Sequence, residues 1–365
     1  MIFFSVGLPG RFAEWCDGVI ARLAGSLGGP TVARQWPSLD EMLGYHPVGR
    51  VLDQVGLFLM RDAPEQLVIG ARQPDERLLA ALAATGIPFI VALDDPRGAV
   101  VDILEKTRVE PAAATRAVAN SCPFIMRYLT IPNALTLHAK NARSNPSGTV
   151  SAIAGHLRIP ITESQVAEIV EGLAQAGLAP VETNGGAGTQ FLPERSRKTL
   201  DGALAPYGAF FAGANMSQFV WTRDLFAIVG DPIKKPVHLI DVSGGARCLI
   251  YGPYIHLPPG SWNARLVLGF SREATGHIFL VDACCCDQQL AATSFRPDST
   301  GIQTAEISFS LGEKTGQGVE VRVMVLDEHA KGQLAFGHVT LTPLALEHFD
   351  GATQARDNFE AVLDL

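Results

Sequence analysis

The sequence predicts an α/β domain followed by an all-β sandwich, both within one chain of 365 residues. Residues 1–180 alternate short apolar runs with helical patterns, which is typical of parallel strands joined by crossover helices. From residue 237 the pattern changes to a period of two, as expected for half-buried antiparallel strands. A stretch rich in Gly, Asn and Pro separates the two regions. We therefore expect a parallel sheet with flanking helices and a separate β-sandwich.

Four segments make up the predicted domain organisation. They are an α/β domain at 1–180, a connecting or lid region at 181–236, a β-sandwich of jelly-roll or immunoglobulin-like type at 237–342, and a helical tail at 343–365. A chain of this length, 47% of it hydrophobic, can bury two sizeable cores.

The charge balance and the cysteine content argue against several classes of partner. A formal net charge of −8 and a pI near 5.6 do not suit a nucleic-acid partner. No apolar run of about 18 residues is present, so no membrane span is expected. The N-terminus lacks the basic residues and the cleavage site of a secretory signal. Six cysteines without zinc-site spacing predict reduced thiols, no metal site and a cytoplasmic location.

The first 23 residues form the element around which the α/β domain is organised. An apolar run at 2–6 leads through the turn 7–10, Gly-Leu-Pro-Gly, into a helical pattern. The apolar residues of that helix share one stripe: Phe12, Trp15, Val19, Ile20 and Leu23. This arrangement is P-loop-like and predicts an anion site at the helix N-terminus, although the Gly-Lys-Ser/Thr of a Walker loop is missing. A tight turn without a ligand is the alternative.

The remainder of the α/β half supplies three further strands and several helices. The expected strands are 67–69, 87–93 and 134–137, and the expected helices are 75–84, 98–104, 111–122, 149–156 and 164–174. Asp94 and Asp95 follow a buried strand at the edge where α/β sheets bind ligands, so they could act as acid and base or cap the next helix. His46 could be a general base or a surface turn residue. We interpret His138 as a core histidine.

Four segments, in order, resemble the sulfotransferase family. VGLPGRFAEW is similar to that family's strand–loop–helix, and PFIVALDDPRGAVVDIL to its strand ending in Arg-Asp/Asn-Pro-Arg. LTLHAKNARSNPSGTV and VSAIAGHLRIPITESQVAEIV are similar to two later segments. The resemblance covers about the first half of the chain. It implies PAPS as donor and transfer of a sulfuryl group.

The resemblance also implies roles for individual residues. The donor would be held by Gly7, Leu8, Pro9, Gly10, Arg11, Phe12 and Arg97. Arg11 would also stabilise the transferred group, and His46 or Asp94 would deprotonate the acceptor.

Several positions depart from the family pattern. The family's cationic loop residue falls at Gly10, and its two loop threonines fall at Ala13 and Glu14. Its Arg and Ser for the donor's 3′-phosphate fall at Asp94 and Asp102. A carboxylate repels a phosphate, so these changes argue against PAPS in its ordinary pose.

The second half predicts seven strands separated by turn signals. They are 246–251, 261–270, 277–283, 288–295, 303–311, 319–326 and 332–341. A short helix is expected at 221–226. Such a series of strands is typical of a sandwich.

One segment of the second half, RCLIYGPYIHLPPGSWNARLVLGF, resembles β-sandwich modules of bacterial glycan-building and glycan-binding proteins. The resemblance implies that Tyr254 and Trp262 offer flat faces on which a sugar ring stacks. Both aromatic residues could instead fill the sandwich core.

Three functions follow from these observations. The first is a sulfotransferase-like protein that acts on or near a polysaccharide, with transfer of a sulfuryl or related anionic group to a glycan hydroxyl. The second is a non-catalytic carbohydrate-binding or scaffold protein with a relic nucleotide loop. The third is a transferase that uses a sugar nucleotide or another nucleotide-linked donor. The sequence leaves the oligomeric state open.

Overall fold

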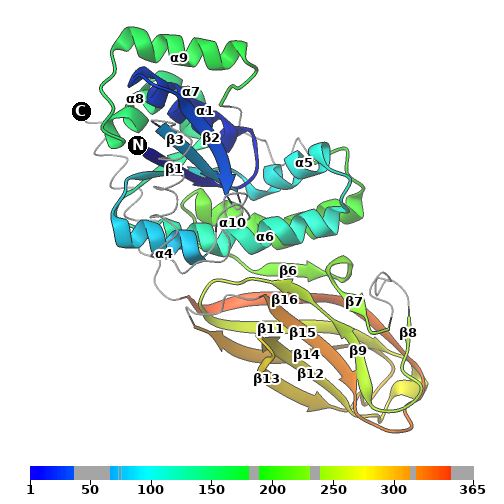
Figure 1. Ribbon diagram of the computed structural model, residues 1–365. Coiled ribbons are helices and arrows are strands. Elements are labelled where there is room, and N and C mark those ends of the chain that lie inside the picture. Colours follow the sequence, from blue (N-terminus) through cyan, green and yellow to red (C-terminus); the bar gives the residue numbers. More distant parts are fainter. Residues whose placement is uncertain are drawn as a thin grey trace. The chain divides into compact units, whose positions relative to one another are not determined.

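The computed structural model describes residues 1–36, 66–72, 74, 76–180, 189–230, 239–312 and 318–346. The chain divides into two compact units (Figure 1). The α/β unit comprises Met1–Arg108 and Ser121–Thr189, and the β unit comprises Val109–Asn120 and Gln190–His348. The predicted fold class, a parallel sheet with helices and a separate all-β part, is confirmed.

The α/β unit is built on a five-stranded parallel sheet with the order β2-β3-β1-β4-β5. The strands are β1 (Ile2–Gly7), β2 (Thr31–Trp36), β3 (Gln66–Ala71), β4 (Phe89–Leu93) and β5 (Ala134–His138). Every residue of β3 and β4 is buried, as expected for strands covered on both faces. The edge strand β2 was not predicted, because three of its six residues are exposed and polar or small.

Helices connect and cover these strands. They are α1 (Arg11–Ser26), α4 (Glu76–Thr85), α5 (Pro96–Lys106), α6 (Pro111–Tyr128), α7 (Ala139–Ser144), α8 (Pro146–His156) and α9 (Glu163–Gln175). The helices expected in this half are confirmed, and α6 continues six residues beyond the expected end at residue 122. The first part of α6 groups with the β unit.

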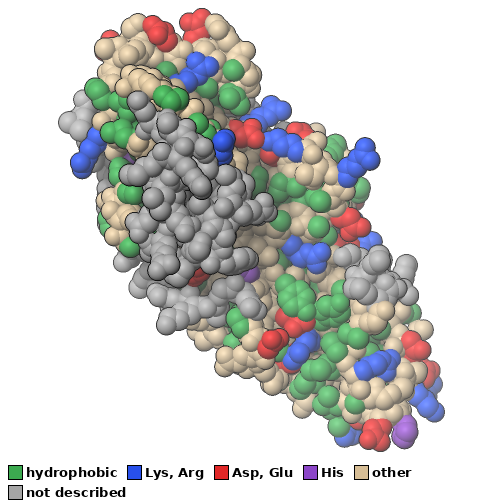
Figure 2. All heavy atoms as spheres, viewed as in Figure 1, with side chains coloured by type: hydrophobic (Ala, Val, Ile, Leu, Met, Phe, Trp, Pro, Cys, Tyr) green, Lys and Arg blue, Asp and Glu red, His purple; other side chains and the backbone are tan. Residues whose placement is uncertain are grey.

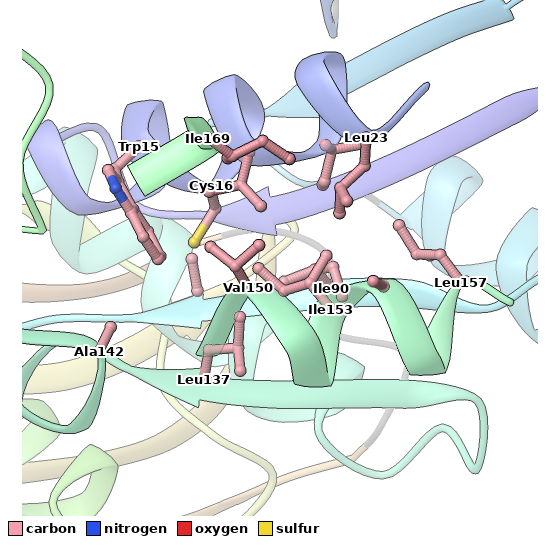
Figure 3. Close-up of a cluster of buried hydrophobic side chains, with 14 of the residues drawn as sticks. Trp15, Cys16, Leu23, Ile90, Leu137, Ala142, Val150, Ile153, Leu157 and Ile169 are labelled. Carbon is pink, nitrogen blue, oxygen red and sulfur yellow. The ribbon is translucent and has the colours of Figure 1, made fainter. Parts of the chain in front are cut away.

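The predicted apolar stripe of α1 forms the centre of the core. All of its residues are buried, and they pack with side chains of β4, α8 and α9 (Figure 3). Trp15 and Leu23 of α1 lie across the core from Val150 of α8 and from Leu157, which directly follows that helix (Figure 3). The first helix is therefore fixed to the sheet along its whole length.

The β unit is a sandwich of two antiparallel sheets. Six strands, β13-β12-β15-β9-β7 with β10 on β15, form one sheet, and five strands, β14-β11-β16-β6 with β8 on β16, form the other. The strands are β6 (Phe219–Thr222), β7 (Ala227–Ile228), β8 (Ile240–Asp241), β9 (Arg247–Tyr251), β10 (Pro253–Ile255), β11 (Gly260–Phe270), β12 (Phe279–Cys285), β13 (Gln288–Phe295), β14 (Gly301–Leu311), β15 (Val319–Val325) and β16 (Gln333–Leu346). The seven predicted strands are confirmed, with shifts at their ends.

Two predictions about helices in this part of the chain differ from the structure. Residues 221–226 form the end of β6 and the 3₁₀ helix Arg223–Leu225 rather than an α-helix. Residues 343–346, expected to begin a helical tail, complete β16, because they pair with β11. The rest of that tail lies outside the described residues, as do residues 181–188 and 231–236 of the predicted lid.

The predicted lid region contains the long helix α10 (Glu194–Phe211). Its buried residues recur every three or four positions, and the last of them, Tyr207 and Phe211, stack on one another. Tyr207 donates a hydrogen bond to the carbonyl of His256 at 3.0 Å. Helix α10 is thus an integral part of the β unit.

Helix α10 comes closest to β6 at Gly202, where an added Cβ would overlap the carbonyl oxygen of Val220. Gly202→Ala should therefore lower the free energy of unfolding by about 1–3 kcal/mol, although alanine favours helices. The matched control is Gly155→Ala in α8, where a Cβ meets open space, and it should raise that free energy by about 0.5–1 kcal/mol. Denaturant unfolding measures both variants. A stabilised Gly202→Ala protein would contradict the close packing.

Candidate functional site

The loop from β1 to α1 has the predicted strand–turn–helix form. Gly10, directly before the helix, has a φ of 152°, a conformation open to glycine but rarely to other residues. No side chain caps α1. The N–H of Glu14 donates to the carbonyl of Gly10 at 3.1 Å, whereas the amides before it have no intrahelical acceptor and point beyond the helix end. The backbone of this loop therefore has the form that the predicted anion site requires.

The side chains of the loop contribute little to such a site. Leu8 and Phe12 are buried, and Phe12 stacks on Trp15 in the core with ring centroids 6.0 Å apart. Arg11 is exposed. Phe12 could therefore meet an anion only through its amide, and Arg11 is the one loop residue with a cationic side chain.

Three charged side chains, one from the first turn of α1 and two from α5, form a cluster. Lys106 at the end of α5 lies 2.5 Å from a carboxylate oxygen of Glu14 and 2.9 Å from one of Asp102. Partial burial lowers the pKa of Lys106, but hydrogen bonds to the two carboxylates more than offset this and raise it overall. The lysine thus stays charged and is shared between the two carboxyl groups. Glu14 and Asp102, two of the three positions that the sulfotransferase pattern fills with hydroxyl groups, are engaged in this cluster.

Arg97 is held by a neighbouring carboxylate. Its guanidinium Nη2 lies 2.6 Å from Oδ2 of Asp95, and its backbone N–H donates to Oδ1 at 2.9 Å. Asp95 is thereby the N-cap of α5, one of the two roles that the sequence left open. Asp94 accepts a hydrogen bond from the amide of Asp95 at 2.8 Å.

The carboxyl edge of the sheet brings further polar residues together. Leu93 pairs with His138 in the register of β4 and β5, so Asp94 and His138 lie at neighbouring strand ends. Burial lowers the pKa of His138, which favours the neutral imidazole. His46 lies outside the described residues, and its predicted role as a base stays a prediction.

Arg72, directly after β3, was missed by the sequence analysis. It forms an ion pair with Asp17 of α1 and donates to the carbonyl of Ala13 at 2.8 Å. Its Nη1 lies 3.4 Å from Oγ of Ser5 on β1. The sequence did contain a signal for this residue, because Arg72 is a cationic residue at the end of an apolar strand. The predicted strand ended at residue 69, so Arg72 was not recognised as lying at a strand end. The pair joins α1 to the sheet beneath the loop.

Trp262, one of the two predicted sugar-stacking residues, is fully buried. It packs against Phe219 with ring centroids 5.7 Å apart, and its indole N–H donates to the carbonyl of Pro258 at 3.1 Å. A sugar cannot reach its faces. Trp262 is therefore a core residue, which the sequence had left as the alternative.

Tyr254, the other predicted residue, lies on the surface of the six-stranded sheet and is 47% exposed. Its hydroxyl donates to the carboxylate of Glu320 at 2.6 Å, and its ring meets the ring of Tyr251 edge-on at 6.2 Å. Burial of the hydroxyl, then the hydrogen bond to Glu320, raises the pKa of Tyr254. The tyrosine is thus neutral and fixed in orientation.

An ion pair with a buried carboxylate lies beside this tyrosine. Glu320 and Arg322 alternate along β15 with buried valines, so both face outward. Arg322 donates to both carboxylate oxygens of Asp282, at 2.9 and 2.5 Å, and Asp282 is only 1% exposed. The hydrogen bond to Asp282 is the main reason why the pKa of Arg322 is raised.

We call Tyr251, Tyr254, Glu320, Arg322 and Asp282 the tyrosine face. Cys284 belongs to the same side of the sheet, since it pairs with Glu320 in the register of β12 and β15. Burial and the charge of Asp282 raise the pKa of the Cys284 thiol to about 11. Figure 2 shows that hydrophobic side chains and charges of both signs lie next to one another on the visible surface of the β unit. No helix of the described residues is long and apolar enough to span a membrane.

Comparisons with known proteins give weak structural neighbours. No protein-family model and no curated protein matches the chain. Among solved structures, the mouse sulfotransferase SULT7A1, complexed with PAP, is 14% identical over 48% of this chain and 63% of its own, with a TM-score of 0.35. The C-terminal CBM6 of LamC, a marine laminarinase from Zobellia galactanivorans, is 10% identical over 34% of this chain and 98% of its own, with a TM-score of 0.24.

A cyclase from Fischerella sp. TAU is 16% identical over 28% of this chain and 59% of its own, with a TM-score of 0.23. The chain spans less than two thirds of the length of this cyclase and of the sulfotransferase. The weak neighbours thus include a sulfotransferase and carbohydrate-binding modules. At these TM-scores the similarities carry no argument about activity, so the function has to be argued from the side chains.

Proposed function

We propose that this chain is a carbohydrate-binding protein and that the tyrosine face holds the sugar. The observation that carries the proposal is Tyr254, a half-exposed ring that Glu320 fixes beside Arg322. The C–H face of a pyranose stacks on such a ring, and its hydroxyl groups pair with a carboxylate and a guanidinium at the ring's edge. A few fixed polar groups around an apolar surface are typical of small-molecule sites.

Preorganisation supports this assignment. Tyrosine has only two side-chain torsions, so little conformational entropy is lost when it binds a ligand. The hydrogen bond from the Tyr254 hydroxyl to Glu320 restricts the ring further before any ligand arrives. The Arg322–Asp282 pair does the same for the guanidinium. A glycan would therefore meet groups that are already in place.

Sulfuryl transfer from PAPS to a glycan hydroxyl is the competing function. The uncapped N-terminus of α1 and the exposed Arg11 favour an anion there. The other described side chains do not fit PAPS, because the carboxylates of Glu14 and Asp102 stand where the family has hydroxyl groups, and Arg97 is paired with Asp95. The proposed function therefore does not use PAPS. In this proposal the α/β unit retains the loop between β1 and α1 but does not transfer a sulfuryl group.

Affinity electrophoresis in gels that contain laminarin, xylan or carrageenan tests the carbohydrate proposal. We expect retardation by at least one polysaccharide and a loss of affinity of about two- to tenfold in Tyr254→Ala, the contribution of one aromatic contact. The control is Phe191→Ala, which removes an exposed aromatic ring elsewhere in the β unit. Equal retardation of the wild type and Tyr254→Ala, or no retardation in any gel, would reject the tyrosine face as the sugar site.

Thermal shift with PAPS and with adenosine 3′,5′-bisphosphate tests the competing function. A donor bound at 100 times its dissociation constant would add about 2.7 kcal/mol of stability. We expect no shift with either nucleotide. A shift that Arg11→Ala abolishes would instead support sulfuryl transfer.

A further inference from the structure

The tyrosine face presents a hydrogen-bond acceptor and a hydrogen-bond donor beside the Tyr254 ring. The Tyr254 hydroxyl donates to Oε1 of Glu320 at 2.6 Å, and within the described residues the second oxygen, Oε2, has no hydrogen-bond partner. Arg322 donates from Nε and Nη2 to the carboxylate of Asp282, which leaves the N–H groups of Nη1 as donors. A ligand at the ring's edge would thus meet one carboxylate oxygen and one guanidinium nitrogen.

A β-bulge places Tyr254 beside these groups. Pro253 and Ile255 pair with the adjacent residues Glu320 and Val319 of β15, so Tyr254 is the extra residue of β10. Its φ of 60° lies in the left-handed region, which glycine or asparagine adopts with less strain than tyrosine. The course of the backbone therefore does not explain a tyrosine at this position, whereas a need for its ring does.

Carboxyl groups outnumber cations around this ring. Among the described residues, the carboxylates and cations whose charge acts on the Tyr254 hydroxyl are Glu320 and Arg322, and those that act on the Cys284 thiol are the same two and Asp282. The one guanidinium is already held by both oxygens of Asp282. An incoming anion would therefore compete with Asp282 for Arg322 and would face Glu320 at the same time.

A sugar hydroxyl suits the acceptor and the donor, and an anionic group does not. The hydroxyl can donate its proton to Oε2 of Glu320 while its oxygen accepts from Arg322. An ionised sulfate or carboxylate only accepts, so it has no proton for Oε2 and brings two negatively charged oxygens together. An anion would thus gain a hydrogen bond from Arg322 and a repulsive contact with Glu320.

We infer that the tyrosine face selects uncharged glycans and that Glu320 is the residue that excludes sulfated and carboxylated ones. This inference rests on the proposed carbohydrate function of the same face and adds the class of polysaccharide. The Tyr254 ring supplies the stacking surface, Glu320 the acceptor and Arg322 the donor. Asp282 holds Arg322 in place and offsets its positive charge.

Affinity electrophoresis with pairs of polymers that share a backbone tests the inference. The pairs are laminarin and laminarin sulfate, xylan and xylan sulfate, and desulfated and native carrageenan. We expect the full-length chain to bind the uncharged member of at least one pair about tenfold more tightly than the sulfated member, the effect of one like-charge contact at a partly exposed site.

Glu320→Gln separates the charge of this residue from the size of the sulfate groups. Glutamine keeps an oxygen for the Tyr254 hydroxyl and replaces the second carboxylate oxygen by an amide N–H donor. The preference for the uncharged member should therefore narrow about three- to tenfold, through tighter binding of the sulfated member. The control is Glu306→Gln in β14 of the other sheet, where a carboxylate that is 57% exposed is removed and the preference should stay unchanged.

The possible failures of the inference and of the proposed function can be told apart. Equal or tighter binding of the sulfated member in every pair that binds would overturn the inference and leave the sugar site in place. The same conclusion would follow if Glu320→Gln changed the preference no more than Glu306→Gln does. No binding to any of these polymers would instead reject the proposed function, and the inference with it.

Discussion

Asp17→Ala is expected to lower the free energy of unfolding by about 3 kcal/mol or more, because it leaves the mostly buried Arg72 guanidinium without its carboxylate. The remaining acceptors, the carbonyls of Ala13 and Ala71 and the hydroxyl of Ser5, carry no charge. Nε of Arg72 already lacks a hydrogen-bond partner among the described residues. Without Asp17, the guanidinium would keep only uncharged acceptors among the hydrogen bonds of the described residues. Chemical denaturation followed by far-ultraviolet circular dichroism measures the loss.

Two further variants define what the Asp17 measurement means. Asp17→Asn keeps an oxygen acceptor in place and should cost less than Asp17→Ala. Glu194→Ala breaks the fully exposed pair of Glu194 with Lys198 on α10 and should leave the unfolding free energy unchanged. If Asp17→Ala unfolded at the same denaturant concentration as the wild type, the pair would not be what fixes α1 to the sheet.

Trp262→Ala is expected to cost about 3–5 kcal/mol, the range for removing a large aromatic side chain from a core. Trp262 is fully buried against Phe219, and its N–H partner Pro258 would lose a donor as well. Tyr254→Ala should cost no more than about 1 kcal/mol, since it removes one hydrogen bond at a half-exposed position. Denaturant unfolding of the two variants side by side measures the difference.

The comparison of these two aromatic residues separates a structural role from a ligand-binding role. Tyr254→Ala should change sugar binding with little change in stability, and Trp262→Phe, which keeps most of the volume, should leave sugar binding intact. A small stability loss in Trp262→Ala would contradict its assignment to the core.

Much of the fold could be predicted because hydrophobic periodicity is a local property. The stripe of α1 and the alternation of Val319 to Val325 show up in short windows of the sequence, and both were predicted correctly. The strand β2 and the helix α10 were missed for the same reason, since neither has a strong apolar pattern of its own. β2 is an edge strand with exposed polar residues, and α10 follows a polar, glycine-rich stretch.

The candidate site was predicted less well, because a motif specifies residue types and leaves their partners open. Arg97 looked available for a phosphate, but Asp95, two positions earlier, binds its guanidinium. Tyr254 was identified as a candidate, whereas Glu320, its hydrogen-bond partner, is 66 residues away in sequence. His46 lies outside the described residues, so its role stays a prediction.

The local sequence was sufficient to predict the α/β and all-β classes and most strands and helices, because buried residues recur with the period of each element. Two features could be read only from the tertiary structure: which aromatic side chains are buried, and which charged side chains pair. A period of two shows which residues share a face of a strand, but the packing of the two sheets places Trp262 inside and Tyr254 outside. Asp17 pairs with Arg72 across 55 residues of sequence, and Glu14 pairs with Lys106 across 92. These charged side chains come together only when the strands assemble into the sheet.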